Sequence, residues 1–511
     1  MRPSVVWIFL ALIISAYVVT LNRLPTQFGD GPFYASIARS LQHGRTGVPS
    51  ILAQGPTAVD HVRFYGPVYF YSLAAWFDLV NCSSLSFRIF CLTAALLAAA
   101  AAAAVSWSLG GGANRQAWAA LLVLLSPELG FAATFGRMDP FAVALEMFGL
   151  AIFVDGITYE RRPWAHGLAA GALLAAAALS TPRTFPFMFG FVIAGVIVLP
   201  RATSRMRAHL SRQTLACVVT ALGLWLVWTI ESSGGPRAWF HMMSYIATHE
   251  DSDVALLKSG RSWMFSWWQG ATPILACIGA LIVAHRLRGS ASYTIAATFA
   301  LVTTWITFVL TWTLFENTFL FEALAILPLF AVILAVPLAT TSAGRGRMAV
   351  VGLAILCFFA AVRGAKIARG VVTWSGRDPS PLTDFVRSHV PTASVVIGYD
   401  EQYFFAVEES GSRYLIASQR SDSDWAQWIP AIEGRPAPAL RPLLGDFLLW
   451  PGPARADLQL PCLQATPRAT YRPPPPDLER FAWAVREDPR AVYPETTLYD
   501  LKATCGTRVV D

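Results

Sequence analysis

Runs of apolar residues recur along most of this 511-residue chain, and short loops that carry arginine separate them. Most of these runs are long enough to cross about 30 Å of hydrocarbon as a helix. The pattern predicts eleven membrane spans, at residues 5–24, 86–108, 116–134, 140–157, 164–180, 184–199, 214–232, 263–284, 292–312, 319–340 and 348–366. We therefore expect a polytopic α-helical membrane protein.

One further apolar segment, residues 65–80, is shorter than the roughly 17–25 residues that a span requires. It is rich in aromatic residues, which favour the headgroup region of a bilayer. If it crossed the membrane, the arginine-rich loop at 200–213 and every other later loop would change sides. We expect it to form an interfacial or re-entrant helix within a large outer loop, residues 25–85. A second large outer loop is expected at 233–262.

Composition supports the membrane assignment and explains the net charge. Hydrophobic residues make up 55% of the chain and charged residues 14%, whereas soluble proteins average about 25% charged residues. The formal charge of +7 comes almost wholly from arginine in short loops. Membrane topology explains this excess better than nucleic-acid binding does, so we expect membrane lipids and no nucleic acid among the partners.

The arginines also indicate which side of the membrane each loop occupies. With the N-terminus inside, the inner loops and the N-terminus carry twelve basic residues, and the outer loops after the first carry five. This bias favours a multi-pass protein of the inner (plasma) membrane with a cytoplasmic N-terminus and an extracytoplasmic C-terminus. The cluster of Arg363, Lys366 and Arg369 argues against this orientation, because it would lie at the outer end of the last span.

The chain changes character near residue 370. Residues 1–369 form the predicted transmembrane domain, and residues 370–511 are polar and rich in proline. Within the second part, short apolar runs alternate with helical patterns, which is typical of a small α/β or α+β domain. The apolar runs lie at 394–397, 413–417 and 446–450, and the helical patterns near 382–389 and 422–432. In an oxidising compartment, Cys462 and Cys505 could pair as a disulfide.

An acid lies directly after the first predicted span. Asp30 stands between two glycines, and Pro32 suits the first turn of a new helix, in which Phe33 and Ile37 recur at helical spacing. Asp30 could simply cap this helix, since Asp is favoured at that position. It could also act as a base toward an acceptor hydroxyl. The two roles are compatible, and we keep both.

A second acid, Asp139, lies in the very short outer loop between the third and fourth spans, on the same face as Asp30. A carboxylate at the bilayer boundary is costly without a partner, and Arg137 is the expected partner. Capping of the fourth span is the alternative role for Asp139, because Asp-Pro opens a helix well. The acid Glu146, within the same span, is a further functional candidate or a hydrogen-bonding contact to a neighbouring helix.

Two more arginines are expected at the outer boundary. Arg63 precedes the aromatic stretch that contains Tyr65, and Arg183 lies in the turn between two short spans. A guanidinium can hold a phosphate through two parallel hydrogen bonds, and a lipid phosphate lies at this depth. Ordinary anchoring to lipid headgroups is the alternative for both.

Four polar residues of the later outer segments are candidates for an acceptor site or a divalent cation site: Glu316, Glu322, His249 and Glu250. They have no fixed ligand spacing, so solvated loop charge is the alternative. The chain contains no glycine-rich phosphate loop, no Ser/His/Asp order and no CxxC motif. Soluble-enzyme chemistry is therefore not indicated.

Four stretches, in this order, resemble motifs of the membrane glycosyltransferases with the GT-C fold. They are Gly29-Asp30-Gly31-Pro32-Phe33-Tyr34-Ala35, Arg63-Phe64-Tyr65-Gly66-Pro67-Val68-Tyr69-Phe70, Phe87-Arg88 with the apolar run after it, and Ser126-Pro127 followed by Arg137-Met138-Asp139. The resemblance is to the superfamily of dolichyl-phosphate-mannose-protein mannosyltransferases and aminoarabinose-transferase-like enzymes, which is glycosyltransferase family 39-like.

The resemblance implies an activity and roles for particular residues. Such an enzyme passes a sugar from a polyprenyl-phosphate carrier to an acceptor hydroxyl of a glycan, lipid or protein on the outer face, with inversion at the sugar. It implies Asp30 as the catalytic base and Asp139 as a second acidic site residue. Arg63 and Arg183 would hold the carrier phosphate, together with Arg137 and Tyr65. Gly31 follows Asp30 where the family commonly has glutamate, so a divalent cation stays an open question.

Three other kinds of protein fit the pattern less well. A transporter would be expected to have inverted repeats and broken helices that meet at mid-membrane, and no repeat is evident. A flippase for lipid-linked sugars would share the substrate, and it differs from an enzyme in transferring no sugar in detergent. A non-catalytic membrane scaffold would use Asp30 and Asp139 only as helix caps.

Overall fold

The computed structural model describes residues 3–23, 30–45, 47–52, 60–126, 129–130, 133, 136–241, 291–314, scattered positions from 354 to 365, and residues 367–398, 401–416, 445–455, 459–460, 463–478 and 492–503. The predicted spans 263–284 and 319–340, the helical pattern at 422–432, and both Cys462 and Cys505 lie outside these residues.

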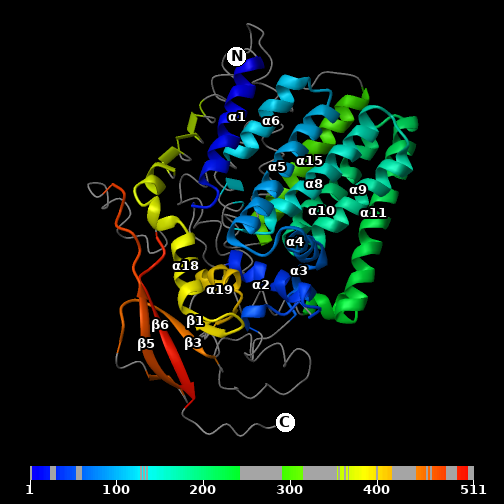
Figure 1. Cartoon of the computed structure of the whole chain (residues 1–511). Coiled ribbons are helices and arrows are strands. Elements are labelled where there is room, and N and C mark those ends of the chain that lie inside the picture. Colours follow the sequence, from blue (N-terminus) through cyan, green and yellow to red (C-terminus); the bar gives the residue numbers. More distant parts are fainter. Residues whose placement is uncertain are drawn as a thin grey trace.

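A bundle of helices forms one end of the molecule (Figure 1). Its described members are α1 (Pro3–Thr20), α5 (Ser84–Ser108), α6 (Ala113–Leu125), α8 (Asp139–Thr158), α9 (Pro163–Ala178), α10 (Phe185–Val198), α11 (Ser204–Ser233) and α15 (Ala291–Leu314). Four described stretches are long and apolar enough to cross a membrane: Ser84–Ser108, Asp139–Thr158, Pro182–Arg201 and Ser204–Ser233. The mainly helical chain with helices of spanning length is confirmed, and the total of eleven spans stays a prediction.

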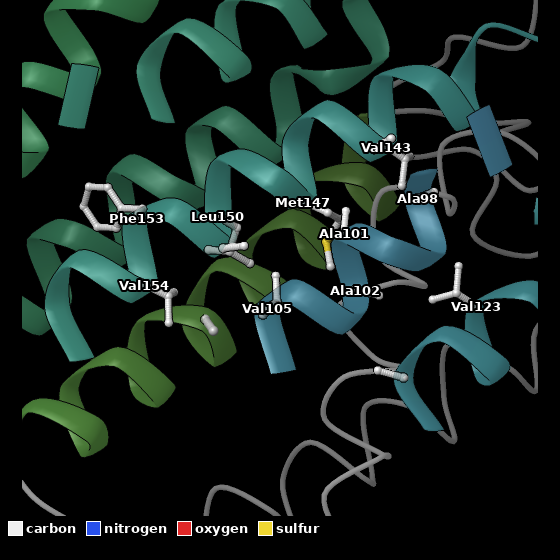
Figure 2. Close-up of a cluster of buried hydrophobic side chains, with 14 of the residues drawn as sticks. Ala98, Ala101, Ala102, Val105, Val123, Val143, Met147, Leu150, Phe153 and Val154 are labelled. Carbon is white, nitrogen blue, oxygen red and sulfur yellow. The ribbon is translucent and has the colours of Figure 1, made fainter. Parts of the chain in front are cut away.

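Small side chains allow the central helices to approach closely. Ala98, Ala101 and Ala102 of α5 lie in one buried cluster with Val143 and Met147 of α8 (Figure 2). Close approach of this kind increases van der Waals contact, which is the main attraction between helices in lipid. The pairing of α5 with α8 holds the start of α8, at Asp139, in a fixed place within the bundle.

Helix α6 is shorter than the sequence pattern predicts. A single span was expected over 116–134, but the helix ends at Leu125. Ser126 has φ −57° and ψ 129°, outside the helical region, because the ring of the following Pro127 disfavours a helical conformation there. Residues 129, 130 and 133 are helical again, so this predicted span is interrupted.

Helices α2 (Asp30–Gln42), α3 (Val62–Tyr65) and α4 (Pro67–Val80) lie between the bundle and the strands (Figure 1). Helix α2 starts at Asp30, where the sequence predicts a new helix, and packs against α4. Helix α4 has only 14 residues, too few to cross the membrane, as expected for 65–80. Its interfacial position stays a prediction.

The C-terminal part contains a six-stranded sheet with the order β2-β1-β3-β6-β5-β4. The strands are β1 (Val395–Gly398), β2 (Arg413–Ile416), β3 (Phe447–Pro451), β4 (Gln459–Leu460), β5 (Leu463–Tyr471) and β6 (Thr496–Ala503). Strand β1 pairs in parallel with β2 and β3, and the remaining pairs are antiparallel. The three parallel strands occupy the three apolar runs predicted from the sequence.

Two helices of the C-terminal part pack together, and α19 also contacts α2. Helix α18 (Ser380–His389) matches the predicted helical pattern, and α19 (Phe404–Glu409) joins β1 to β2. One buried cluster includes Tyr34 of α2, Phe70 of α4, Phe405 of α19 and Tyr414 of β2. The boundary at 369/370 stays a prediction, and the two parts on either side of it share a core.

Candidate functional site

Asp139 forms the centre of a buried ion cluster at the start of α8. Its carboxylate lies 2.9 Å from Nε of Arg137 and 3.5 Å from Nη1 of Arg183. The side chains of Asp139 and Arg137 are almost fully buried, and that of Arg183 is 28% exposed. The expected pairing of Asp139 with Arg137 is therefore present. Two guanidinium groups from separate parts of the chain thus meet at one buried carboxylate.

The beginning of α2 lies against this cluster. Gly136, three residues before Asp139, has φ +85°, and an added Cβ there would overlap the Phe87 ring and lie 3.1 Å from Cα of Gly31. Only glycine fits this close approach. The backbone of the first acidic motif, at Asp30 and Gly31, is thus brought beside the second. The side chain of Asp30 lies outside the described part of the structure.

The motif of residues 63–70 is brought to the same place by the end of α9. Gly66 has φ +95°, and an added Cβ there would overlap the backbone of Leu179. The amide of Val68 donates a hydrogen bond of 3.0 Å to the Leu179 carbonyl. Leu179 is followed by the turn that carries Arg183, in the 3₁₀ helix η2 (Pro182–Thr184). The amide of Arg183 donates a hydrogen bond of 3.4 Å to the Thr181 hydroxyl, which caps η2. Segments far apart in the sequence therefore meet around Asp139.

Aromatic rings form one wall beside the cluster. The ring of Tyr34 lies edge-on to those of Tyr65 and Tyr69, at 5.9 and 6.3 Å between centroids. The guanidinium of Arg137 lies 6.0 Å from the Tyr34 ring, a cation–π contact. Sequence reasoning chose Tyr65 and gave no role to Tyr34 or Tyr69. The signal was available, since Tyr34 and Tyr69 both lie within the motifs that carry the resemblance.

Tyr69 adds a buried hydroxyl to this wall. Burial raises the pKa of Tyr69 well above its ordinary value, so the phenol stays protonated. Within the described residues its hydroxyl has no hydrogen-bond partner. It is therefore a donor that a ligand oxygen could satisfy.

Arg63 lies on α3, half exposed, with its Nε 3.9 Å from the carboxylate of Asp60. The same carboxylate accepts a hydrogen bond of 3.0 Å from the Val62 amide at the start of α3. Burial raises the pKa of Asp60, and the hydrogen bond and Arg63 oppose that shift. The described ion pair of Arg63 is therefore with Asp60, and its role toward a phosphate stays a prediction.

Glu146 lies two helical turns beyond Asp139 on the same face of α8. It is fully buried, and neither carboxylate oxygen has a hydrogen-bond partner within the described residues. The separation along the helix axis is about 10 Å, from seven residues at ~1.5 Å each. The hydrogen bond to a neighbouring helix, which the sequence left open, is not found among those residues.

The structure does not describe the four remaining candidates. Glu316, Glu322, His249 and Glu250 are all outside the described residues. Among the residues that the structure describes, no group of three His, Cys, Asp or Glu side chains could hold a metal ion.

Comparison with solved structures shows that the chain has the GT-C fold, which those structures of membrane glycosyltransferases share. The chain is similar to ArnT from Cupriavidus metallidurans bound to undecaprenyl phosphate, with 13% identity, a TM-score of 0.59, and coverage of 88% of this chain and 94% of that one. It is also similar to the oligosaccharyltransferase AglB from Archaeoglobus fulgidus, in complex with an inhibitory peptide and a dolichol-phosphate, with 12% identity and a TM-score of 0.50.

The AglB match covers 88% of this chain and 69% of that one. No family model matches the sequence, and no curated protein matches it. The resemblance to the GT-C fold, inferred from four short motifs, is confirmed at the level of the fold.

Proposed function

We propose that this protein is a glycosyltransferase of the inner (plasma) membrane that takes a sugar from a polyprenyl-phosphate donor. The acceptor is a hydroxyl of a glycan, lipid or protein on the outer face. Two solved structures of the same fold have undecaprenyl phosphate or a dolichol-phosphate bound, which supports a lipid-phosphate ligand here.

The observation that carries the proposal is the ion cluster of Asp139, Arg137 and Arg183. Both guanidinium groups lie beside the buried Asp139 carboxylate, so they are held together where phosphate oxygens could accept hydrogen bonds from them. Arg183 keeps 28% of its side chain exposed and is the member that a ligand can reach. Guanidinium groups match the geometry of phosphate oxygens and bind them strongly when partly desolvated.

In this proposal Asp139 is a positioning residue. It has 3% exposure and two cationic partners, so it is poorly placed to take a proton from an incoming acceptor. Its negative charge instead holds Arg137 and Arg183 in position. Arg63, on α3, is assigned to the entrance of the site, where it would meet the carrier phosphate or a lipid headgroup.

Asp30 is the proposed base. It takes the proton of the acceptor hydroxyl while that oxygen attacks the anomeric carbon of the sugar. The bond between that carbon and the phosphate oxygen breaks, and its electron pair leaves with the polyprenyl phosphate. Arg183 and Arg137 stabilise the charge on this leaving group. The product is a glycoside of inverted configuration, and no nucleotide is required.

The test is sugar transfer by the purified full chain in detergent. Polyprenyl-phosphate-linked sugars are supplied as a panel, because the sugar is not known. We expect Asp30→Asn to abolish transfer while the variant stays monodisperse with an unchanged melting temperature. Asp500→Asn, which breaks an exposed ion pair with Arg468 on the C-terminal sheet, is the matched control and should keep full activity.

Full transfer by Asp30→Asn would remove Asp30 as the base. Absence of transfer by the wild type with every donor of the panel, combined with movement of the donors across liposome membranes, would favour a flippase instead.

A further inference from the structure

The short helix α19 of the C-terminal part contacts two separate elements of the first hundred residues. Oε2 of Glu408 lies 3.2 Å from Nε of Arg39, in the last turn of α2. The next residue, Glu409, accepts a hydrogen bond of 2.9 Å from the amide of Ser84, the first residue of α5. Two consecutive carboxylates thus hold the end of α2 and the start of α5.

A path of close contacts leads from α19 to the other end of α2. The rings of Phe405 and Phe87 lie 5.5 Å apart between centroids. Phe87 in turn occupies the space that a Cβ on Gly136 would need, and that Cβ would be 3.1 Å from Cα of Gly31. Helix α19 is therefore connected to both ends of the helix that begins at Asp30.

The contacts of α19 are desolvated enough to be specific. The Glu408 side chain is 10% exposed and that of Arg39 is 30% exposed. Such a pair adds little net stability, because the cost of removing two charges from water offsets their attraction. Breaking it leaves a charge without its partner, so the pair favours one arrangement of α2 against α19 over others.

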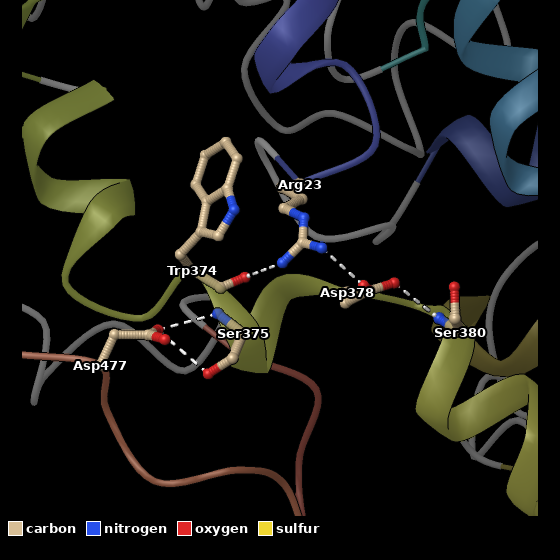
Figure 3. Close-up of polar contacts among 6 residues, drawn as sticks. All are labelled: Arg23, Trp374, Ser375, Asp378, Ser380 and Asp477. Carbon is tan, nitrogen blue, oxygen red and sulfur yellow. Dashed lines mark hydrogen bonds and ion pairs between the residues drawn. The ribbon is translucent and has the colours of Figure 1, made fainter.

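A second anchor ties the C-terminal part to the end of α1 (Figure 3). Arg23 donates to the Trp374 carbonyl at 2.9 Å and to the Asp378 carboxylate at 2.7 Å. Asp477 in turn accepts hydrogen bonds from both the amide and the hydroxyl of Ser375. The segment that carries α18 and α19 is thus fixed independently of α2.

We propose that α19 is a positioning element for the site, in which Glu408, through Arg39, and Glu409, through Ser84, set the place of α2 and so of Asp30. The catalytic half of this inference rests on the proposed function, whereas the docking of α2 does not. A displacement of about 1 Å at reacting groups can lower the rate about a hundredfold, so docking errors at α2 would act on turnover.

The test uses the full chain in detergent, with Glu408→Gln and with the reversed pair Arg39→Glu and Glu408→Arg. Asp500→Asn is the matched control, because Asp500 pairs with Arg468 on the exposed surface of the sheet. Amide hydrogen exchange over residues 30–42 reports on the docking, and transfer kinetics report on the consequence. Binding of undecaprenyl phosphate is followed in parallel.

For Glu408→Gln we expect exchange over 30–42 to rise about tenfold and kcat to fall about tenfold, with the donor KM changed less than about twofold. The reversed pair should restore most of the protection from exchange and most of kcat. Asp500→Asn should change neither the exchange over 30–42 nor kcat. A loss caused by general unfolding would also raise exchange in α11 and weaken binding of undecaprenyl phosphate.

Unchanged exchange over 30–42 in Glu408→Gln would overturn the inference, as would a reversed pair no better than Arg39→Glu alone. If the wild type transfers no sugar but exchange responds as expected, the proposed function fails and the docking of α2 by α19 stands. If transfer is normal in every variant while exchange responds, the positioning role is rejected.

Discussion

At the scale of single residues, Asp139 has the most constrained environment in the site. It is nearly inaccessible to solvent, and both of its partners are guanidinium groups. The partner at i−2, Arg137, follows from the sequence because a carboxylate at the membrane boundary needs a nearby cation. The second partner, Arg183, could not be inferred from the sequence, since it is 44 positions away from Asp139. It reaches Asp139 because α9 ends beside Gly66.

Asp139→Asn tests this environment. Removing one partner from a buried ion pair costs about 3–5 kcal/mol, because the remaining charges are left uncompensated. We expect a marked fall in the melting temperature of the detergent-solubilised protein. Asp500→Asn, which breaks an exposed pair, should cost roughly 0–1 kcal/mol and barely change it. Equal melting temperatures for the two variants would be incompatible with the buried cluster.

Gly136→Ala tests the approach of α2 to the turn before α8. A side chain in the left-handed region costs about 1–2 kcal/mol, and overlap with Phe87 adds about 1–3 kcal/mol. Gly110→Ala is the matched control, because Gly110 also has positive φ, +70°, but would meet no atom within 4 Å. Thermal unfolding should separate the two variants clearly. A Gly136→Ala protein as stable as Gly110→Ala would mean that the two segments are not in contact.

At the scale of elements, the sequence predicts local structure well where turns and breaks are set by a few residues. Helix α2 begins at Asp30, α4 begins at Pro67 after Gly66, and β1 to β3 occupy the apolar runs. The end of α6 at Leu125 was missed, although the Ser126-Pro127 pair marks it. Strands β5 and β6 were also missed, since their alternating polar residues give no apolar run.

The contact of α19 with α2 was beyond prediction for a different reason. Glu408 and Arg39 are 369 positions apart. Nothing local in either helix indicates the other, because each reads alone as a charged residue on a solvated helical face. Only the assembly of the fold, in which both helices contribute to one apolar cluster, brings the pair together.

The stability of the folded protein, as distinct from the placement of α2, should depend on pH through Glu408 and Glu409. Burial raises the carboxyl pKa of Glu408, and Arg39 and Arg413 oppose the shift. Burial also raises the carboxyl pKa of Glu409, and the hydrogen bond from the Ser84 amide and the charge of Arg387 oppose this shift. The folded protein therefore binds these protons more tightly than the unfolded chain does. Their contribution to stability is complete below the ordinary value of 4.5 and is lost as pH rises through the raised values.

We therefore expect Glu408→Gln to flatten the fall in melting temperature as pH rises above about 4.5, since Gln cannot titrate. Thermal scans of the wild type and the variant across this range provide the measurement. Asp500→Asn serves again as the control and should follow the wild-type slope. A steeper slope in Glu408→Gln would show that the carboxylate is favoured, not disfavoured, in the folded protein.

At the scale of the whole molecule, two parts with separate sequence character share a core and meet around α2 and α4 (Figure 1). The general class, a membrane protein with the GT-C fold, could be predicted from the apolar runs and four short motifs, although the identity to solved structures of this fold is only 12–14%. The placement of the C-terminal sheet against α2 and α5 could not be predicted, because it depends on contacts between residues hundreds of positions apart.

The proposed function depends most on the binding of a polyprenyl-carrier phosphate by the arginines around Asp139. Native mass spectrometry of the full chain with undecaprenyl phosphate tests it directly. We expect the wild type to bind the lipid, and Arg183→Ala to bind it about 10–100-fold more weakly, from the loss of charge-assisted hydrogen bonds of about 1.5–3 kcal/mol. Arg201→Ala, at the opposite end of the same apolar stretch, should bind like the wild type. Equal binding by Arg183→Ala and the wild type, or no binding by either, would contradict the account.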